Sequence, residues 1–97
     1  MSTLRLTPAA RNDLSEIWDW TARRWDDAQA NIYVGELHAG MLRIAEDPRR
    51  GRDRTEMAEG YRSYAVGKHV LWFTVPSAET VDVIRVLHQR MDPSRNL

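Results

Sequence analysis

The hydrophobic pattern of this chain changes its period once, near residue 48, and that change limits the folds open to it. Between residue 8 and about residue 46, apolar side chains recur every three or four positions, which is the spacing of amphipathic helices. Beyond that point, runs rich in valine, isoleucine and aromatic residues predict three strands, at Tyr61–Val66, His69–Val75 and Thr80–Leu87. Thr3–Leu6 alternates polar and apolar residues and predicts one more strand before the helices.

Capping residues set the ends of the two expected helices. Thr7-Pro8 is typical of a helix start, because the threonine side chain accepts a first-turn amide and proline fits the first helical position. We therefore expect the first helix over residues 8–24. Trp25-Asp26-Asp27 interrupts the pattern and supplies an aspartate cap for a second helix, which Asp47-Pro48 ends.

Short connections fix how these elements pair. The brief break between the helices predicts an antiparallel hairpin, and the turns Gly67-Lys68 and Pro76–Glu79 predict antiparallel strands. Gly35 and Gly40 each cost about 1 kcal/mol inside a helix, which indicates close approach to the first helix or to the sheet. The sequence thus predicts an α+β fold in the order β-α-α-β-β-β, a helical hairpin packed on one face of a small, mainly antiparallel sheet.

Length and composition restrict the class of protein. The 97 residues suit one domain, 1–97, with an exposed tail at about residues 92–97. Fourteen basic and fourteen acidic residues give no bulk attraction to nucleic acid, so we expect no direct specific DNA binding by this chain alone. There is no cysteine, no apolar run of membrane-spanning length, and no signal-peptide core in Met1–Leu6, so we expect a cytoplasmic protein with no membrane partner.

The predicted sheet is apolar on both faces. Leu71 and Phe73 point to one side of their strand, while Val70 and Trp72 point to the other. A sheet covered on one side only should alternate more cleanly with polar residues, so either loops or a second chain covers the other face. We favour the second chain, because uncovered apolar patches usually mark binding sites.

Tryptophans sharpen this expectation. Trp18, Trp25 and Trp72 fit the predicted core, whereas Trp20 falls off the stripe of the first helix. Trp20 is therefore either an interface anchor or a partly covered rim of the core. The candidates for a partner interface are Trp20, Leu71 and Phe73.

Two histidines are the candidates for proton transfer. If Pro76–Glu79 makes the turn, His69 faces Val86, and His88 lies diagonal to His69 on the same face. Together with Arg62 they form a possible catalytic set for RNA cleavage, in which one imidazole takes the 2′-hydroxyl proton and the other protonates the leaving oxygen. Alternatively, both histidines only hydrogen-bond at the sheet edge. No nucleotide loop, zinc-binding pair or serine elbow is present, so we expect no metal site and no cofactor.

Arginines gather in two stretches. One stretch contains Arg49, Arg50, Arg52 and Arg54, and the other contains Arg85, Arg90 and Arg95. Such charge runs form a basic binding surface or are simply solvated.

Short motifs along nearly the whole chain resemble the ParE branch of the RelE/ParE toxin superfamily. They are Leu6–Ala10, Asp13–Trp20, Arg24-Trp25, Ala28–Ala30, Tyr33, Asp47–Arg49 with Gly51-Arg52, Gly60–Tyr64, Gly67–Val70 and, as the most distinctive, Val83–Asp92. The resemblance implies the β-α-α-β-β-β arrangement and an antitoxin partner of the ParD type, whose tail wraps the toxin. ParE-like toxins are described as inhibitors of DNA gyrase, whereas RelE-like relatives cut messenger RNA on the ribosome.

Charge favours the gyrase branch over the nuclease branch. RelE-type nucleases are strongly basic with a late tyrosine, but here the net charge is zero, Lys68 is the only lysine and no tyrosine follows Tyr64. We therefore expect a non-enzymatic toxin that inhibits gyrase, with a RelE-like, metal-independent mRNA endoribonuclease or a degenerate toxin as alternatives. The expected target-binding residues are Arg62, Arg85, His88 and Arg90, together with the tail Asp92–Leu97.

Overall fold

A helical hairpin and a five-stranded sheet make up the computed structural model, which describes residues 2–97. In chain order the elements are β1 (Thr3–Leu6), α1 (Pro8–Arg24), α2 (Asp27–Glu46), the 3-10 turn η1 (Pro48–Arg50), β2 (Arg52–Asp53), β3 (Arg62–Val66), β4 (His69–Ser77), β5 (Thr80–His88) and α3 (Pro93–Asn96). The strand order across the sheet is β1-β5-β4-β3-β2. Only β1 runs parallel to its neighbour, β5, so the predicted α+β fold and its mainly antiparallel sheet are confirmed.

Local capping accounts for the helix ends. The Thr7 hydroxyl accepts the Ala10 amide at 3.0 Å, and the Asp26 carboxylate accepts the Gln29 amide at 2.7 Å. Both caps satisfy amides that have no partner within the helix. The predicted caps are therefore confirmed. The expected exposed tail differs in one respect, because its residues Pro93–Asn96 form a short helical turn that Asp92 caps.

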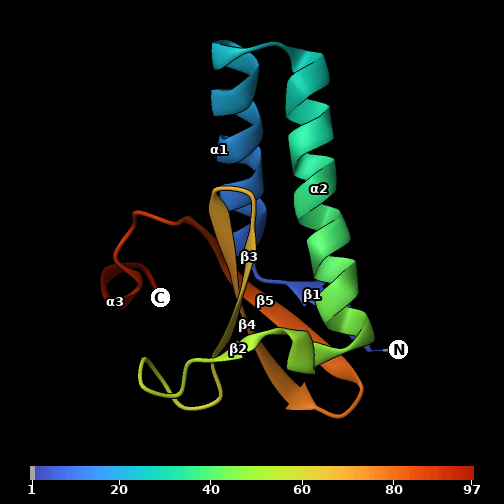
Figure 1. The fold of residues 1–97 in the computed structure, drawn as a ribbon, viewed down its shortest axis with the longest axis vertical. Coiled ribbons are helices and arrows are strands. Elements are labelled where there is room, and N and C mark those ends of the chain that lie inside the picture. The colour runs from blue at the N-terminus through green and yellow to red at the C-terminus, as the bar shows by residue number, and fades with distance from the viewer. Residues whose placement is uncertain (1) are drawn as a thin grey trace.

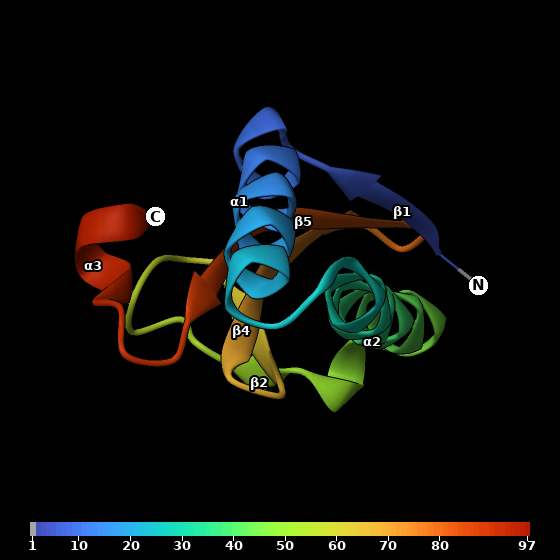
Figure 2. The same cartoon turned by 90° about the horizontal axis from the view of Figure 1, so that it is seen from above.

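The hairpin packs on one face of the sheet and extends beyond it. In Figure 1 the lower parts of α1 and α2 lie over the strands, while their connected ends rise past the β3–β4 turn. Seen from above, α1 and α2 lie side by side, and α3 lies on the far side of α1 from α2 (Figure 2). Within residues 2–97, no helix is both long enough and apolar enough to cross a membrane.

The main core lies between the hairpin and the sheet. Its buried members are Ala10, Leu37, Met41, Ile44, Val66, Leu71, Phe73, Val81, Val83 and Val86. Leu71 and Phe73 have no exposed surface, and the backbone of Gly40 in α2 lies close to Leu71 while that of Gly51 lies close to Phe73. Their expected place in a partner interface is therefore wrong: a side chain without accessible surface has nothing to offer a second protein in this conformation.

The opposite face of the sheet is covered by the chain itself. Trp72 is 3% exposed and Leu87 is 1% exposed. The guanidinium of Arg54, from the segment between β2 and β3, lies 4.6 Å from the centre of the Trp72 ring. Such stacking places a cation against the negative face of the ring and shields it from water. The favoured expectation that a second chain covers this face is wrong, and the alternative of a covering loop is what the structure has.

One extra residue in β5 changes which side chains face the helices. Trp72 pairs with Arg85, but Phe73 pairs with Val83, so Ile84 is left over as a β-bulge. The bulge returns Val86 to the same buried side as Val83, whereas uninterrupted alternation predicts opposite sides. The bulged residue is also bonded to the start of α1, because the Thr7 hydroxyl donates to the Ile84 carbonyl at 2.7 Å.

The two helical glycines have different surroundings. A Cβ on Gly40 would lie 2.5 Å from Val66 Cγ2, so this glycine lets α2 approach the sheet closely, as expected. A Cβ on Gly35 would meet nothing within 4 Å, so the expectation of close approach is wrong there.

Candidate functional site

A groove of about 1040 Å³ opens between the hairpin and the β3–β4 turn. Its walls come from α1, the start of α2, the turn, and β5 with the residues that follow it. The side chains that matter for its chemistry are Asp13, Trp20, Trp25, Tyr33, His69, Arg85, His88 and Met91. A concave surface that joins apolar side chains with a few fixed polar groups is the usual form of a binding site.

Two exposed tryptophans stand at one end of the groove. Trp20 is 57% exposed and Trp25 is 66% exposed, with the Arg24 guanidinium 5.8 and 5.9 Å from their ring centres. The predicted core position of Trp25 is wrong. This residue is the C-cap of α1, where the backbone leaves the helix, so its side chain no longer follows the helical stripe. Trp18 is half-buried and donates its ring N–H to Asn31 at 2.9 Å.

An ion pair between the buried Asp13 and the half-buried Arg85 forms part of the groove floor. Both oxygens of Asp13 on α1 accept from Arg85 on β5, Oδ2 from Nε at 2.7 Å and Oδ1 from Nη2 at 2.9 Å. Oδ2 also accepts the Val86 amide at 2.9 Å, which joins the helix to the strand just after the bulge. Its hydrogen bonds to Asp13 raise the pKa of Arg85, so the guanidinium stays charged.

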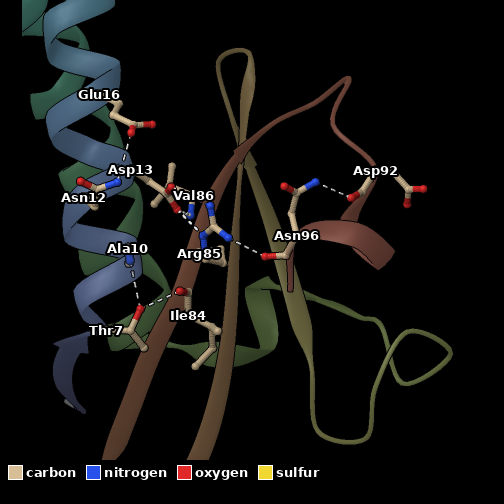
Figure 3. Close-up of polar contacts among 10 residues, drawn as sticks. All are labelled: Thr7, Ala10, Asn12, Asp13, Glu16, Ile84, Arg85, Val86, Asp92 and Asn96. Carbon is tan, nitrogen blue, oxygen red and sulfur yellow. Dashed lines mark hydrogen bonds and ion pairs between the residues drawn. The ribbon is translucent and has the colours of Figure 1, made fainter.

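Arg85 makes a third contact, with the C-terminal turn. Its Nη1 donates to the main-chain oxygen of Asn96 at 2.6 Å, as Figure 3 shows. All three guanidinium nitrogens are therefore used within the chain. The role of Arg85 in target binding stays a prediction, while its internal role is visible in the contacts.

The two candidate histidines are direct neighbours at the turn end of the groove. His69 pairs with His88 across β4 and β5, and the ring centres are 5.3 Å apart. The same-face prediction is confirmed, but the predicted partner of His69, Val86, is wrong by two positions. The hairpin turn is tighter than expected, with Ser77 paired directly to Thr80.

Hydrogen bonds hold both rings. The Tyr33 hydroxyl lies 2.6 Å from His69 Nδ1 and accepts the Lys68 amide at 3.1 Å, which leaves the hydroxyl hydrogen for the imidazole. His88 Nδ1 accepts the amide of Arg90 at 3.1 Å. Gly67, at φ +56, brings the turn so close to Tyr33 that a Cβ there would lie 3.0 Å from its hydroxyl.

Burial controls the charge of this cluster. The pKa of His69 is lowered to about 4, chiefly because burial disfavours the charged ring and also because His88 lies beside it, while Asp13 partly opposes the change. Burial likewise raises the pKa of Tyr33. At neutral pH the pair is therefore an uncharged hydroxyl bonded to an uncharged imidazole.

Arg62 lies apart from the other candidates. It pairs with Phe73, four strand positions from the Val66–His69 pair, or about 13 Å along the strand. There its Nη2 donates to the Gly51 carbonyl at 2.7 Å beside a separate hollow of about 460 Å³. The expected grouping of Arg62 with the two histidines is therefore wrong.

Most arginines of the mid-chain stretch are paired locally. Arg49 meets Asp47 at 3.1 Å, Arg50 meets Glu46 at 3.6 Å, and Arg54 meets Glu56 at 2.7 Å. Local pairing favours the solvated interpretation of this stretch over a basic binding surface.

Sequence reasoning missed Asp13 and Tyr33. Asp13, a charged residue of the first expected helix, was assigned no role from the sequence, yet it is 6% exposed. Its spacing of three residues from Ala10 and four from Ile17 places it on the buried side, which is the signal that could have revealed it. Tyr33 belongs to α2, and only the turn packed against it shows the use of its hydroxyl.

The fold, a helical hairpin on a mainly antiparallel five-stranded sheet, defines a small α+β protein that has a counterpart among solved structures. A chain in the solved structure described as "Chromosomal ParDE TA system from P. aeruginosa" superimposes with a TM-score of 0.78. The match covers 91% of this chain and 96% of that chain, at 19% sequence identity. At this identity the likeness concerns the fold.

Sequence comparisons give the family. Residues 4–93 match the model of the ParE toxin of type II toxin–antitoxin systems, parDE. Toxin ParE1 of Mycobacterium tuberculosis is 49% identical over 92 residues, covering 95% of this chain and 94% of that protein. Toxin ParE1 of Caulobacter vibrioides is 39% identical over 97 residues, covering 100% and 99%. The chain therefore belongs to the ParE toxin family of type II toxin–antitoxin systems.

Proposed function

We propose that this toxin acts in the cytoplasm by binding and inhibiting DNA gyrase, without catalysis of its own, and that a ParD-like antitoxin holds it inactive. The observation that carries the proposal is the family match over residues 4–93. The groove and the C-terminal segment supply two surfaces that such a toxin needs, one for each partner.

The groove suits the antitoxin. Its rim carries Trp20 and Trp25, large aromatic side chains that have little packing to lose inside the chain. Tryptophan is the residue type most enriched among energetically dominant interface positions. An extended or helical antitoxin tail laid along the groove would cover both rings and Met91. Trp20 thus remains our interface candidate, and Trp25 and Met91 join it.

The end of β5 and the segment after it suit the target. His88 lies partly exposed at the strand end, and Arg90 and the Asp92–Leu97 segment follow it on the surface. Arg62 lies at the other end of β3 from the histidines and is left out of the proposed contact region. That region consists of His88, Arg90 and α3, with Arg85 behind them. A surface of this kind binds a protein more readily than it neutralises a row of phosphates.

Supercoiling by purified gyrase tests the proposal. Relaxed plasmid is incubated with gyrase, ATP and increasing amounts of the toxin, and the topoisomers are resolved on a gel. We expect supercoiling to fall as toxin is added and to recover when the antitoxin is added with it. Heat-unfolded toxin is the control, and normal supercoiling at a large molar excess of folded toxin would contradict the proposal.

The adjacency of His69 and His88 supports one second candidate, a metal-independent ribonuclease. Against it, the Tyr33 bond occupies His69 Nδ1 and burial keeps this ring neutral, while Arg62 is too far away to stabilise a phosphorane. Cell-free translation separates the two functions. A nuclease would cut the message at once, whereas a gyrase inhibitor would leave translation intact. If both His69→Ala and His88→Ala were fully toxic, the ribonuclease function would be excluded.

A further inference from the structure

The C-terminal turn is tied to the rest of the molecule by one hydrogen bond. Within residues 2–97, the polar contacts of Asp92–Leu97 are otherwise internal to that segment: Asp92 caps Ser94, Asn96 Nδ2 donates to the Asp92 carbonyl, and Leu97 N donates to Pro93. The exception is the bond from Arg85 Nη1 to the Asn96 oxygen at 2.6 Å. A four-residue helix has no independent stability, so its place on the surface depends on this bond and on its packing against β5.

Arg85 is suited to hold the turn because its own position is fixed. Asp13 binds two of its nitrogens in a bidentate pair and also accepts the Val86 amide, so helix, strand and guanidinium form one unit (Figure 3). The third nitrogen is thereby aimed at Asn96. A planar guanidinium can make both contacts at once, whereas a lysine ammonium is a single point charge on a flexible stem.

We propose that Arg85 is a positioning residue: from its ion pair with Asp13 it holds α3 in the orientation that the target recognises, and does not touch the target itself. The proposal rests on the proposed function for its target, but the tether of α3 to Arg85 can be measured without any target.

Hydrogen exchange tests the tether. We expect Arg85→Lys to keep its charge beside Asp13 but to release α3, so that the amides of Arg95 and Leu97 exchange about tenfold faster, as loss of one charge-assisted bond predicts. The amides of α1 and β5 should keep their protection. Arg11→Lys is the matched control, because Arg11 is an exposed α1 residue whose side chain makes no hydrogen bond or ion pair within residues 2–97. Unchanged exchange in α3 of Arg85→Lys would overturn the proposal.

A double-mutant cycle separates positioning from contact. Asp92→Ala removes the cap of α3 and leaves the Asp13–Arg85 pair intact, so it disturbs the same turn by a different route. The readouts are the toxin concentration that half-inhibits gyrase and the expression level that arrests growth. We expect the half-inhibitory concentration of each single variant to be about tenfold higher than that of the wild type. The double variant should require no higher concentration than the less active of the two single variants. If the two effects multiply, Arg85 contacts the target and the proposal is wrong.

These readouts also keep the two levels of inference apart. Toxicity without gyrase inhibition would refute gyrase as the target, and the growth measurements would still complete the cycle. A wild-type chain that neither slows growth nor inhibits gyrase would refute the proposed function and, with it, the recognition of α3. The exchange data would still decide whether Arg85 tethers the turn.

Discussion

Aromatic residues serve opposite purposes at the two ends of this molecule. On the sheet, Phe73 is enclosed in the main core and Trp72 is covered by Arg54. At the hairpin tip, Trp20 and Trp25 are mostly in solvent, beyond the strands that could have covered them. The difference teaches that stability is concentrated where helix meets sheet. The overhanging tip keeps its large apolar surface free for a partner.

The largest test of this division is a pair of truncations. Phe73→Ala removes a fully buried ring and should lower the free energy of unfolding by about 3–5 kcal/mol. Trp20→Ala should change it by less than about 0.5 kcal/mol, because the indole already faces water. Urea unfolding followed by circular dichroism measures both. If Trp20→Ala were nearly as destabilising as Phe73→Ala, the division between a stabilising sheet core and a free hairpin tip would be wrong.

Alanine substitutions at the two glycines of α2 test the same division, with smaller effects on stability that differ in sign. Gly40→Ala forces a methyl group against Val66 and should destabilise the fold by about 1–3 kcal/mol. Gly35→Ala adds a methyl group in open space and should stabilise it by about 0.5–1 kcal/mol through helix propensity. Thermal unfolding of the two variants beside the wild type gives the signs. A loss of stability in Gly35→Ala would mean that the exposed side of α2 is packed in solution.

The smallest expected effect on stability concerns His69, at the turn end of the groove between the sheet and the hairpin tip. His69 has a pKa of about 4 in the fold and 6.5 when unfolded, so below pH 6.5 the unfolded chain binds a proton that the folded chain refuses. Stability should therefore be highest above about pH 6.5 and fall as the pH drops towards 4. The loss should be about 1 kcal/mol, since the ring is only partly buried.

The difference between wild type and His69→Gln isolates this contribution from carboxylates that titrate nearby. His38→Gln is the control, because His38 is exposed on α2. Urea unfolding between pH 7.5 and pH 4.5 should show a shallower pH dependence in His69→Gln alone. Identical curves for all three proteins would show that His69 does not remain neutral in the fold.

Local signals made most of the fold predictable. Thr7, Asp26 and Gly67 act through their own or adjacent backbone, so the helix caps and the tight turn follow from neighbouring residues alone. The site was less accessible to this reasoning. The burial of Asp13 and the separation of Arg62 from His69 depend on contacts between elements far apart in sequence.

The sheet faces show the same limit. The apolar residues of β4 were recognised correctly, but which of them needs an outside partner depends on Arg54, in a segment without regular structure. The register of β4 and β5 failed because it was counted from a turn placed two residues too wide. Errors of this kind arise wherever one assumed turn sets the position of every residue beyond it.

The bulge at Ile84 has a consequence for how relatives of this chain can be aligned and altered. Removing Ile84 would leave Val83 and Val86 two positions apart, which is the spacing of residues on one face, so Arg85 could stay paired with Trp72 and Val86 with Leu71. Gaps are therefore not interchangeable along β5. A one-residue shortening between Val83 and Val86 can be absorbed by loss of the bulge, whereas a shortening between Val86 and His88 has no spare residue beside it and would move His88 from its place opposite His69.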